Sequence, residues 1–574
     1  MNVTHLCKTS ELPQEMALQF QLNGALFNGN VPECIEDWKG DGTMEKKKVI
    51  VTERIAEEGL ALLRKELDVD YRDGISREEL LNIIDQYDAL IVRSVTKVNE
   101  ELVSRGTRLK VVGRAGNGID NIDVEACTRF GVVVANTPDS NTISAAEQTI
   151  SLLLSSARFT AAANAFVKSG KWDRKPFRGE ELYGKTVGIV GLGRIGSMVA
   201  TRLKSFNMKV IAYDPYISNE RFDRFGAEKK NTLEELAKEA DFITVHTPRN
   251  EETMHMINED IFQLAKDGVR VVNCARGGII KEAALIEGLA SGKVASAGLD
   301  VFEKEPAQPD NPLFKFANVV CTPHLGADTY EAQKRVGENI AEQVILALQG
   351  DIVPNMINLP TLLSEELDYL RPYIYLAEKM GNIYHQLEKA PVSRVELTYS
   401  GPLTMNETEI LTVAFMKGLL DPVMEGRVNY VNARLVADER GIRVFETREA
   451  QSSKRYKNLI TARIIDHQHQ LEVVGTVSRG HDPLLVEING YETETVLEGY
   501  VLIVKNEDRP RVIGPFATAL GDQGVNIASM KVARQNKGET AIMLINVDSK
   551  VEEAVLEKLG DIGGLVERPR LLAF

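Results

Sequence analysis

From residue 48 onward, short apolar stretches alternate with segments of helical periodicity. The runs KVIVT, ALIVRS, KVVGRAG and GVVVANTP are rich in β-branched residues, and helical patterns separate them. Short apolar runs between helical segments are typical of parallel βαβ units. The first part of the chain is therefore predicted to form an α/β lobe around a doubly wound sheet.

A second series of the same kind begins at KTVGIVGLGRIG. Residues 144–167, just before it, are predicted to form one long helix, and the runs KVIAYD, FITVHTP, VRVVNCA and ASAGLDV follow with helical segments between them. This pattern predicts a second doubly wound sheet. Residues 330–349 read as one helix, long enough to run back across the first lobe.

Beyond residue 350 the pattern changes, and the stretch 351–360 with its prolines and asparagines is predicted to be a linker. Alternating strands follow, as in SRVELTYSG and LEVVGTVSRG, and a last unit from GYVLIVKNEDRP has the pattern of a small α+β module. The expected parts are a disordered extension (1–44), a first lobe (45–143 and 328–350), a second lobe (144–327), a middle α+β domain (361–496) and a C-terminal module (497–574).

Composition narrows the functional classes. The 574 residues carry a net charge of −15, so the overall field repels nucleic acid and anionic membranes, and an anionic substrate needs a local basic pocket. Five scattered cysteines show no zinc or disulfide spacing, which favours a reducing, cytoplasmic setting without a metal site. No apolar run approaches the roughly 20 residues that span a bilayer, so a soluble protein is expected. Residues 1–43 lack arginine and an apolar core, which argues against a targeting peptide and makes Met44 a candidate true start.

The strongest local motif is the glycine loop GLGRIG, directly after the strand KTVGIV and at the head of a helix. Gly191 permits the tight turn, Gly193 allows close approach to a pyrophosphate, and Gly196 allows tight helix packing. The first helical N–H groups can donate to phosphate oxygens. The loop therefore predicts a dinucleotide site, although G-x-G-x-x-G alone can mark an ordinary glycine turn.

Asp214, at the end of the next strand, lies where such sites place an acid for the ribose 2′-hydroxyl. A carboxylate there would repel the extra phosphate of NADP, and no arginine follows immediately, so the predicted cofactor is NAD. A turn cap before Pro215 is the plainer alternative for Asp214.

Three residues in loops after the predicted strands can perform hydride-transfer chemistry on a hydroxy acid. His324 in TPHLGA can take the hydroxyl proton, Glu305 in VFEKEP can hydrogen-bond its other ring nitrogen, and Arg276 in NCARGG can hold a carboxylate. Each alone could be an ordinary surface or loop residue. In this order after a dinucleotide motif, they predict a catalytic set.

Together GLGRIG, the strand end at Asp214, HTP, NCARGG, LDVFEKEP and PHLGA resemble the D-2-hydroxyacid dehydrogenase family over roughly residues 45–350. The resemblance implies that Arg276, Glu305 and His324 are catalytic and that the second lobe binds NAD. It implies further cofactor contacts, which are Asn117, Arg194, Ile195, Thr247, Cys274, Ala275, Asp300, Gly326 and Ala327. Lobe closure about hinges near Asn141 and Ala327 is expected during transfer.

The stretches IVRS and VVGRAGNGIDNID resemble the phosphoglycerate dehydrogenase branch of that family. Arg93 and Arg114 end predicted parallel strands, where open α/β sheets place ligands; as a simpler alternative they could be surface charges. The resemblance implies 3-phosphoglycerate as substrate, with contacts from Ser94 and from the backbone at Gly116, which lies near its carboxylate or the cofactor. It also implies that Arg174, in GKWDR, reaches the substrate phosphate from a neighbouring subunit. Asn117 departs from the threonine that this branch leads us to expect.

The last segment resembles an ACT domain, a βαββαβ module that pairs edge to edge and binds amino acids. The resemblance implies L-serine as an effector at Asp508 and Asn526, in a homodimer or homotetramer. A pure dimerisation unit stays an alternative, because Asn506 replaces a histidine of some serine-inhibited relatives. The middle segment resembles the extra domain of long-form relatives, and its basic cluster Lys454, Arg455 and Lys457 is either an anionic effector site or a solvated face.

Three other functions share parts of this pattern. A glyoxylate or hydroxypyruvate reductase would share the catalytic set but needs neither phosphate arginines nor the C-terminal domains. A non-catalytic NAD-sensing regulator would tolerate loss of the acid–base pair, which this chain keeps. A formate dehydrogenase is disfavoured, because that relative carries glutamine where Glu305 stands.

Overall fold

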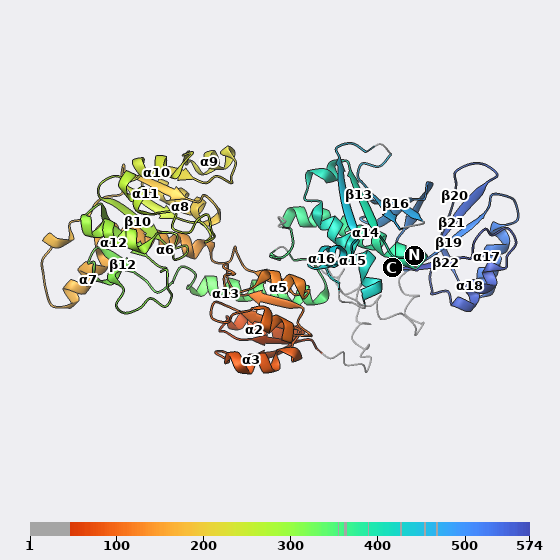
Figure 1. Ribbon diagram of the computed structural model, residues 1–574, viewed down its shortest axis with the longest axis horizontal. Coiled ribbons are helices and arrows are strands. Elements are labelled where there is room, and N and C mark those ends of the chain that lie inside the picture. Colours follow the sequence, from red (N-terminus) through yellow and green to blue (C-terminus); the bar gives the residue numbers. More distant parts are fainter. Residues whose placement is uncertain are drawn as a thin grey trace, which may run out of the picture. The chain divides into compact units, whose positions relative to one another are not determined.

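The computed structural model describes residues 46–353, 355–360, 364–388, 390–424, 428–452, 455–466 and 469–574. The expected extension 1–44, with its candidate start Met44, and Lys454 of the basic cluster lie outside the described residues. The described residues form four sheets, each with its own helices (Figure 1).

The first lobe is built on a five-stranded parallel sheet with strand order β2-β1-β3-β4-β5. Its central strands are buried at every or nearly every position, as expected for a parallel sheet covered on both faces. Its elements are β1 (Lys48–Val51), α2 (Glu57–Glu66), β2 (Asp68–Tyr71), α3 (Arg77–Ile83), β3 (Ala89–Val92), α4 (Glu100–Arg105), β4 (Val111–Arg114), α5 (Val124–Arg129) and β5 (Val133–Asn136).

The second lobe has a seven-stranded parallel sheet with order β12-β11-β10-β9-β6-β7-β8. The strand order reverses between β6 and β9, and open α/β sheets bind ligands outside the carboxyl ends of the strands at such a point. Its strands are β6 (Thr186–Val190), β7 (Lys209–Tyr213), β8 (Glu228–Lys229), β9 (Phe242–Val245), β10 (Val269–Asn273), β11 (Val294–Leu299) and β12 (Val319–Cys321). Its helices are α6 (Thr142–Arg158), α7 (Thr160–Lys168), α8 (Arg194–Ser205), α9 (Asn219–Phe225), α10 (Leu233–Glu239), α11 (Glu259–Leu264) and α12 (Glu282–Ser291).

The prediction of one long helix over residues 144–167 was wrong. Phe159 adopts a left-handed conformation (φ 54°, ψ 32°), ends α6 and begins α7, and the two helices meet at 65°. A non-glycine residue with positive φ carries no sequence signature, so periodicity alone could not locate the break. No single described helix is long and apolar enough to cross a membrane, and only this bent pair satisfies that length and composition jointly.

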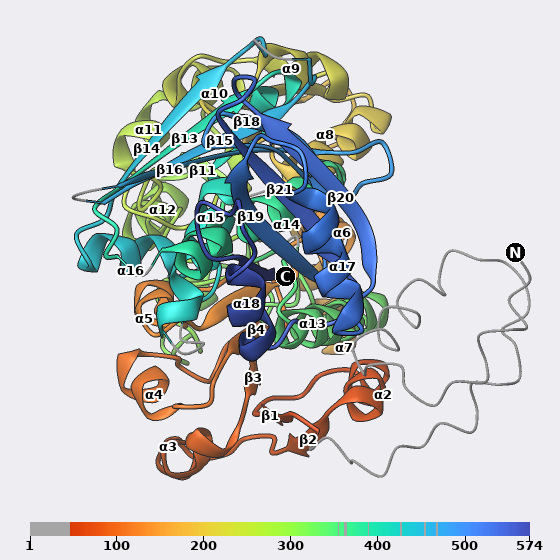
Figure 2. The ribbon, with the colours of Figure 1, turned by 90° about the vertical axis from the view of Figure 1, so that its right-hand side faces the viewer.

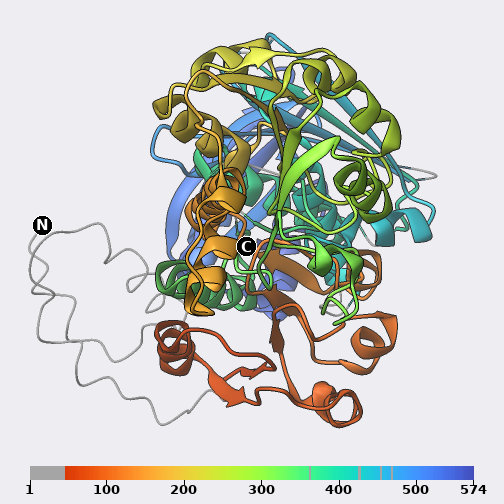
Figure 3. The same ribbon diagram turned by 90° about the vertical axis from the view of Figure 1, so that its left-hand side faces the viewer.

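Helix α13 (Tyr330–Gln349) returns to the first lobe, as its sequence predicted. A Cβ added to Gly59 of α2 would lie 2.4 Å from the carbonyl oxygen of Gly337, so two glycines let the helix backbones approach closely. Figure 3 shows α13, in green, beside α2, in red. The chain passes between the two lobes twice, near Ser144 and near Thr329. A hydrogen bond of 2.7 Å between Ser144 Oγ and Thr329 Oγ1 joins these two segments.

The middle domain has a six-stranded mixed sheet with order β14-β13-β15-β16-β17-β18, in which only the β13–β14 pair is parallel. Its helices are α14 (Ser364–Leu387), α15 (Glu409–Met424) and α16 (Ala433–Glu439). Its strands are β13 (Arg394–Ser400), β14 (Arg443–Glu449), β15 (Leu459–Ile465), β16 (Gln470–Val477), β17 (Pro483–Ile488) and β18 (Tyr491–Val496).

The C-terminal module has the order βαββαβ and an antiparallel sheet β20-β21-β19-β22, with α17 and α18 on one face (Figure 2). Its elements are β19 (Tyr500–Glu507), α17 (Ile513–Asp522), β20 (Ile527–Arg534), β21 (Thr540–Val547), α18 (Glu553–Gly560) and β22 (Arg570–Ala573). The predicted fold class, two doubly wound lobes followed by two α+β domains, is confirmed.

Candidate active site

The glycine loop follows β6 at the point where the strand order reverses. Gly191 has φ +90°, and a Cβ there would lie 2.9 Å from the carbonyl oxygen of His246. A Cβ on Gly196 would lie 2.0 Å from the carbonyl oxygen of Gly191, whereas one on Gly193 would meet nothing within 4 Å. The loop is thus tight where it packs on the protein and open at Gly193, where α8 begins.

Asp214 holds this loop in place. Its Oδ2 accepts the Leu192 N–H at 2.9 Å, and its Oδ1 accepts the Tyr216 N–H at 3.1 Å. The second bond is the turn cap that the sequence left as an alternative, and the first attaches the carboxylate to the glycine loop. The two interpretations of Asp214 are therefore compatible.

Several polar atoms beside the loop lack a partner within the described residues. Thr247 Oγ1 and His246 Nδ1 are buried and make no hydrogen bond there, and burial lowers the pKa of His246 to about 4. Buried polar groups are normally satisfied, so such orphans need an explanation. Together with the first N–H groups of α8, which have no intrahelical acceptor, they fit a polar ligand such as a dinucleotide.

Arg194, at the start of α8, pairs with Asp139 at 2.7 Å, and both side chains are more than half exposed. Ile195, beside it, is partly exposed.

Asp300 is 1% exposed and organises the loop before α13. Its Oδ1 accepts from Thr322 Oγ1 at 2.5 Å and from the Leu325 N–H at 2.8 Å, and its Oδ2 accepts from the Gly326 N–H at 2.8 Å. Cys274 Sγ lies 3.5 Å from the same Oδ2. This carboxylate, which the family resemblance implies as a cofactor contact, is therefore surrounded by donors from the protein itself. Ala327, next along, accepts from Gln333 Nε2 at 2.9 Å.

His324 and Glu305 form a pair. Nδ1 of the imidazole lies 2.7 Å from Glu305 Oε2, and Glu305 Oε1 accepts the Phe302 N–H at 3.0 Å. Burial raises the pKa of Glu305, but the bonds from His324 and Phe302 and the charges of His324 and Arg276 outweigh it and hold that pKa below its usual value. Glu305 therefore stays ionised beside the imidazole.

Arg276 lies in the loop after β10, where Asn273 braces it by donating to the Arg276 carbonyl at 2.9 Å. Its Nη1 donates to the Ala275 carbonyl at 2.7 Å, and its Nε lies 3.3 Å from Asp120 Oδ2 of the first lobe. A Cβ on Gly118 would lie only 2.1 Å from Nη2, so the missing side chain leaves room for the guanidinium.

Arg114 completes a group of three arginines. Burial, followed by the charges of Arg276 and Arg93, lowers its pKa to about 10, and its Nε is buried without a partner in the described residues. A Cβ on Gly116 would lie 1.6 Å from Arg114 Nη1, so this glycine also makes room for a guanidinium. Such a group attracts an anion.

The remaining first-lobe residues differ in exposure. Ser94 is exposed, and the Asn117 carbonyl accepts from Asn136 Nδ2 at 2.6 Å. Arg174 is exposed between α7 and β6. Its expected role requires a second copy and stays a prediction.

The sequence missed Glu53, Asp120 and Asn121. Glu53 accepts hydrogen bonds from the Arg93 loop, Asp120 touches Arg276, and Asn121 donates to the Arg93 carbonyl. Glu53 stands just beyond a predicted strand and Asn121 within the quoted GIDNID stretch, so both positions carried a signal.

The two expected effector residues of the last module have partners of their own. Asp508 Oδ2 accepts from Arg534 Nη1 at 3.0 Å and from the Gly538 N–H at 2.8 Å, and Asn526 Nδ2 lies 2.5 Å from Asp548 Oδ2. Within one chain they do not bond to each other.

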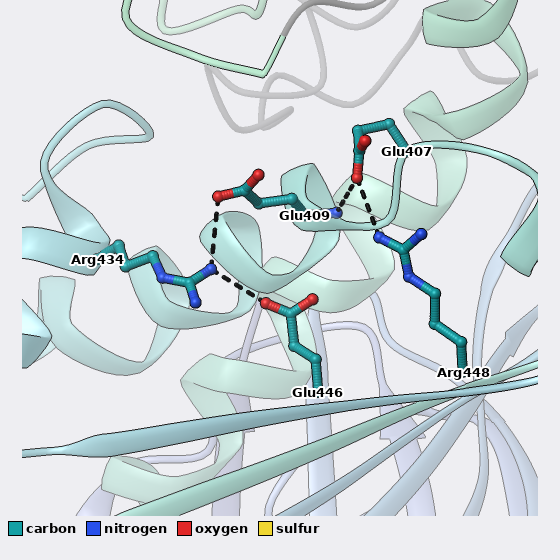
Figure 4. A pocket seen from close by; sticks show the side chains of 5 residues that line it. All are labelled: Glu407, Glu409, Arg434, Glu446 and Arg448. Atoms are coloured by element: carbon teal, nitrogen blue, oxygen red, sulfur yellow. Dashed lines mark hydrogen bonds and ion pairs between the residues drawn. The ribbon is translucent and has the colours of Figure 1, made fainter.

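The middle domain contains a charged hollow of about 340 Å³ lined by Glu407, Glu409, Arg434, Glu446 and Arg448 (Figure 4). Both arginines in it point at glutamates, with Arg434 Nη1 lying 3.0 Å from Glu446 and Arg448 Nη2 lying 3.1 Å from Glu407. Arg455 of the predicted basic cluster likewise pairs with Glu494 at 2.7 Å. These cations are already neutralised, which weakens the case for an anionic effector there. No group of three or more possible metal ligands occurs among the described residues.

Comparison with known families agrees with this geometry. Residues 150–326 match the D-isomer specific 2-hydroxyacid dehydrogenase NAD binding domain, residues 369–489 the D-3-phosphoglycerate dehydrogenase intervening domain, and residues 500–564 the ACT domain.

Relatives extend the match to most of the chain. D-3-phosphoglycerate dehydrogenase of Methanocaldococcus jannaschii is 45% identical over 90% of this chain and 98% of its own length, and that of Bacillus subtilis is 41% identical over 90% and 98%. A crystal structure of a glyoxylate reductase from Paecilomyes thermophila superimposes with a TM-score of 0.51 at 30% identity, covering 55% of this chain and 99% of that one. The chain belongs to the D-3-phosphoglycerate dehydrogenase family.

Proposed function

We propose that this chain oxidises 3-phospho-D-glycerate to 3-phosphohydroxypyruvate with NAD, the first step of L-serine biosynthesis. The observation that carries the proposal is the trio Arg93, Arg114 and Arg276, in which Arg276 also acts through its charge on Glu305 of the His324–Glu305 pair. A substrate with both a carboxylate and a phosphate brings two anions to one site, and guanidinium groups bind both well.

The catalytic roles follow from which atoms of His324 and Glu305 already make hydrogen bonds. Nδ1–H of His324 donates to the Glu305 carboxylate, so Nε2 carries the lone pair and takes the proton of the substrate hydroxyl. The positive charge that then forms on the imidazole is stabilised by ionised Glu305. When bound, NAD accepts the hydride that leaves C2 of the hydroxy acid.

Arg276 binds and orients the substrate carboxylate. Its guanidinium rests against Asp120 with a weak 3.3 Å contact, which a bidentate carboxylate can replace. Gly193 and the α8 N-terminus would hold the pyrophosphate, and Asp214 the ribose hydroxyls. The lobes close about the two connecting segments near Asn141 and Ala327, which the Ser144–Thr329 hydrogen bond joins, and this closure excludes water.

Regulation belongs to the same proposal. We place L-serine at Asp508 and Asn526 of ACT modules that pair in a homodimer or homotetramer. We also place the enzyme in the cytoplasm, because the free thiols Cys127, Cys274 and Cys321 suit a reducing setting. Binding of labelled serine to the whole protein, and its loss in Asn526→Ala, tests the effector site. Failure to bind millimolar serine would leave the module as a dimerisation unit.

The deciding experiment for the reaction is NADH oxidation with 3-phosphohydroxypyruvate, set beside hydroxypyruvate and glyoxylate. A strong preference for the phosphorylated acid is expected, because the arginines gain a second anion. Equal or better rates with the other two acids would favour a reductase, to which the two lobes alone are also similar. No activity with any of them would favour an NAD-sensing regulator.

A further inference from the structure

Four consecutive backbone N–H groups converge on one carboxylate in the first lobe. Glu53 Oε1 accepts from Arg93 at 2.9 Å and from Thr96 at 2.9 Å. Its Oε2 accepts from Ser94 at 3.0 Å and from Val95 at 3.1 Å. Glu53 follows β1 and residues 93–96 follow β3, so neighbouring parallel strands bring carboxylate and loop together at the ligand edge of the sheet.

The loop is also held through its carbonyl groups. Asn121 Nδ2 donates to the carbonyl oxygens of Arg93 at 2.9 Å and Thr96 at 2.6 Å, and Thr52 Oγ1 lies 2.9 Å from Thr96 Oγ1. The main chain is fixed on both sides, while the Arg93 guanidinium makes one hydrogen bond among the described residues, to the Arg54 carbonyl at 3.2 Å. The loop is therefore rigid in its backbone and presents a lightly restrained arginine.

The charge of Glu53 has a second effect. Burial raises the pKa of Glu53, but the N–H groups of the loop outweigh it and hold that pKa below its usual value, so the side chain is ionised at neutral pH. The same negative charge opposes the lowering of the Arg114 pKa by burial and by the other arginines. Glu53 thus compensates part of the positive charge of the arginine group before an anionic substrate arrives.

We propose that Glu53 is a positioning residue for substrate binding, which fixes the loop of residues 93–96 so that Arg93 and Ser94 meet the anionic end of the substrate. This inference rests on the proposed function and deepens it. Glu53 acts through Arg93 and Ser94, so its removal should weaken substrate binding far more than it slows the chemical step.

Replacement by glutamine tests the inference sharply. Glutamine has the same shape but one acceptor oxygen, and its NH₂ group would face two N–H donors. In E53Q we expect KM for 3-phosphohydroxypyruvate to rise about tenfold or more, as for lost charge-assisted hydrogen bonds. We expect kcat to change less than about threefold, and the Kd for NADH to stay unchanged. E53D, which keeps both acceptors on a shorter stem, should lie between E53Q and the wild type.

The matched control is E57Q in α2, because Glu57 pairs only with exposed Arg64 at 2.5 Å among its described contacts. Its kinetic constants should equal those of the wild type. An unchanged KM in E53Q would overturn the inference, as would parallel losses of kcat, NADH affinity and unfolding midpoint, which indicate a merely structural role.

Failure of the proposed function gives a different result. If the wild type prefers an unphosphorylated keto acid, the substrate assignment fails, but the E53Q series is run with that preferred acid. A selective rise of its KM would still support Glu53 as a positioning residue, and an unchanged KM would overturn that role independently.

Discussion

Nδ1 of His324 and Oε2 of Glu305 lie 2.7 Å apart, and Glu305 is fixed from behind by the Phe302 N–H. The carboxylate therefore determines both the direction of the imidazole and the nitrogen that carries the proton. The other nitrogen, Nε2, is left for the substrate in the proposed reaction, so replacement of either member of the pair should have a different effect.

Glu305→Gln keeps the shape of the pair but removes the charge that favours the protonated imidazole. We expect kcat to fall about 10- to 100-fold, and His324→Ala to cost about 10²- to 10⁴-fold, as for loss of a general acid–base group. Steady-state rates of keto-acid reduction check both losses, with NADH affinity as the control, and an unchanged kcat in Glu305→Gln would contradict the role of Glu305.

The carboxylate of Glu305 also predicts how the stability that it contributes depends on pH. Because the pKa of Glu305 is lowered in the fold, its contribution to stability is fully present above its unfolded pKa and is lost as the pH falls through the lower, folded value. The difference in unfolding midpoint between wild type and Glu305→Gln should therefore vanish at acid pH, below the ordinary range for a glutamate. A difference that persisted there would be inconsistent with an ionised Glu305.

Asp214 is expected to influence the choice of cofactor through its charge, and it holds the glycine loop by accepting the Leu192 N–H. Asp214→Asn keeps an acceptor for one N–H but loses the charge that repels a 2′-phosphate. We expect the Kd for NADH to rise about tenfold and the preference for NADH over NADPH to shrink by a similar factor. Fluorescence titration with both nucleotides measures the two effects, and an unchanged preference would show that the charge does not discriminate.

What the sequence predicted well was local. The glycine loop, the acid after β7 and the motif loops of Arg276, Glu305 and His324 each lie within a few residues of a recognisable strand, so short-range rules located them. The return of α13 was also predictable, because residues 330–349 read as one helix long enough to run back across the first lobe.

What the sequence could not predict depends on contacts between distant segments. Glu53 meets its loop across 40 residues, and Asp120 meets Arg276 across 156. Both are acids at positions that the sequence marks as near a strand end or a motif, but nothing local identifies the distant partner. The break at Phe159 was missed for another reason, since one left-handed residue needs neither glycine nor proline.

Gly118 should prove functional rather than structural. Alanine there would push Arg276 Nη2, the end of a flexible side chain, away from its position without disturbing any backbone. We expect kcat/KM for the keto acid to fall about 10- to 100-fold while the unfolding midpoint stays within about 2 °C. Arg276→Lys, which loses the planar fork, is the reference variant and should show a loss of similar kind. Near-normal kinetics in Gly118→Ala would mean that the absence of a side chain at residue 118 does not determine the position of the Arg276 guanidinium.

The contact between Gly59 and Gly337 predicts a stability effect. A methyl group on Gly59 would lie 2.4 Å from a backbone oxygen, so α2 and α13 would have to separate, at a cost of about 1–3 kcal/mol. The midpoint of the first unfolding transition in urea should therefore move to a lower urea concentration. Gly514→Ala in α17, which meets nothing within 4 Å, serves as the control and should be neutral or stabilising. An unchanged free energy of unfolding in Gly59→Ala would contradict the close contact between α2 and α13.

The pair of Arg194 and Asp139 predicts a variant that binds cofactor more tightly. Arg194 begins α8, where a pyrophosphate would lie, yet Asp139 holds it at 2.7 Å. Asp139→Asn would free the guanidinium, but exposed ion pairs contribute only about 0–1 kcal/mol, so the Kd for NADH should fall at most about fivefold. The gain should disappear at high salt, because both side chains are exposed. Asp267→Asn removes an equal charge, from a carboxylate that pairs with Lys293 in the same lobe, and should leave the Kd unchanged. An equal gain in both variants would indicate a general change in field, and weaker binding in Asp139→Asn would mean that Asp139 orients Arg194 for the cofactor rather than competing with it.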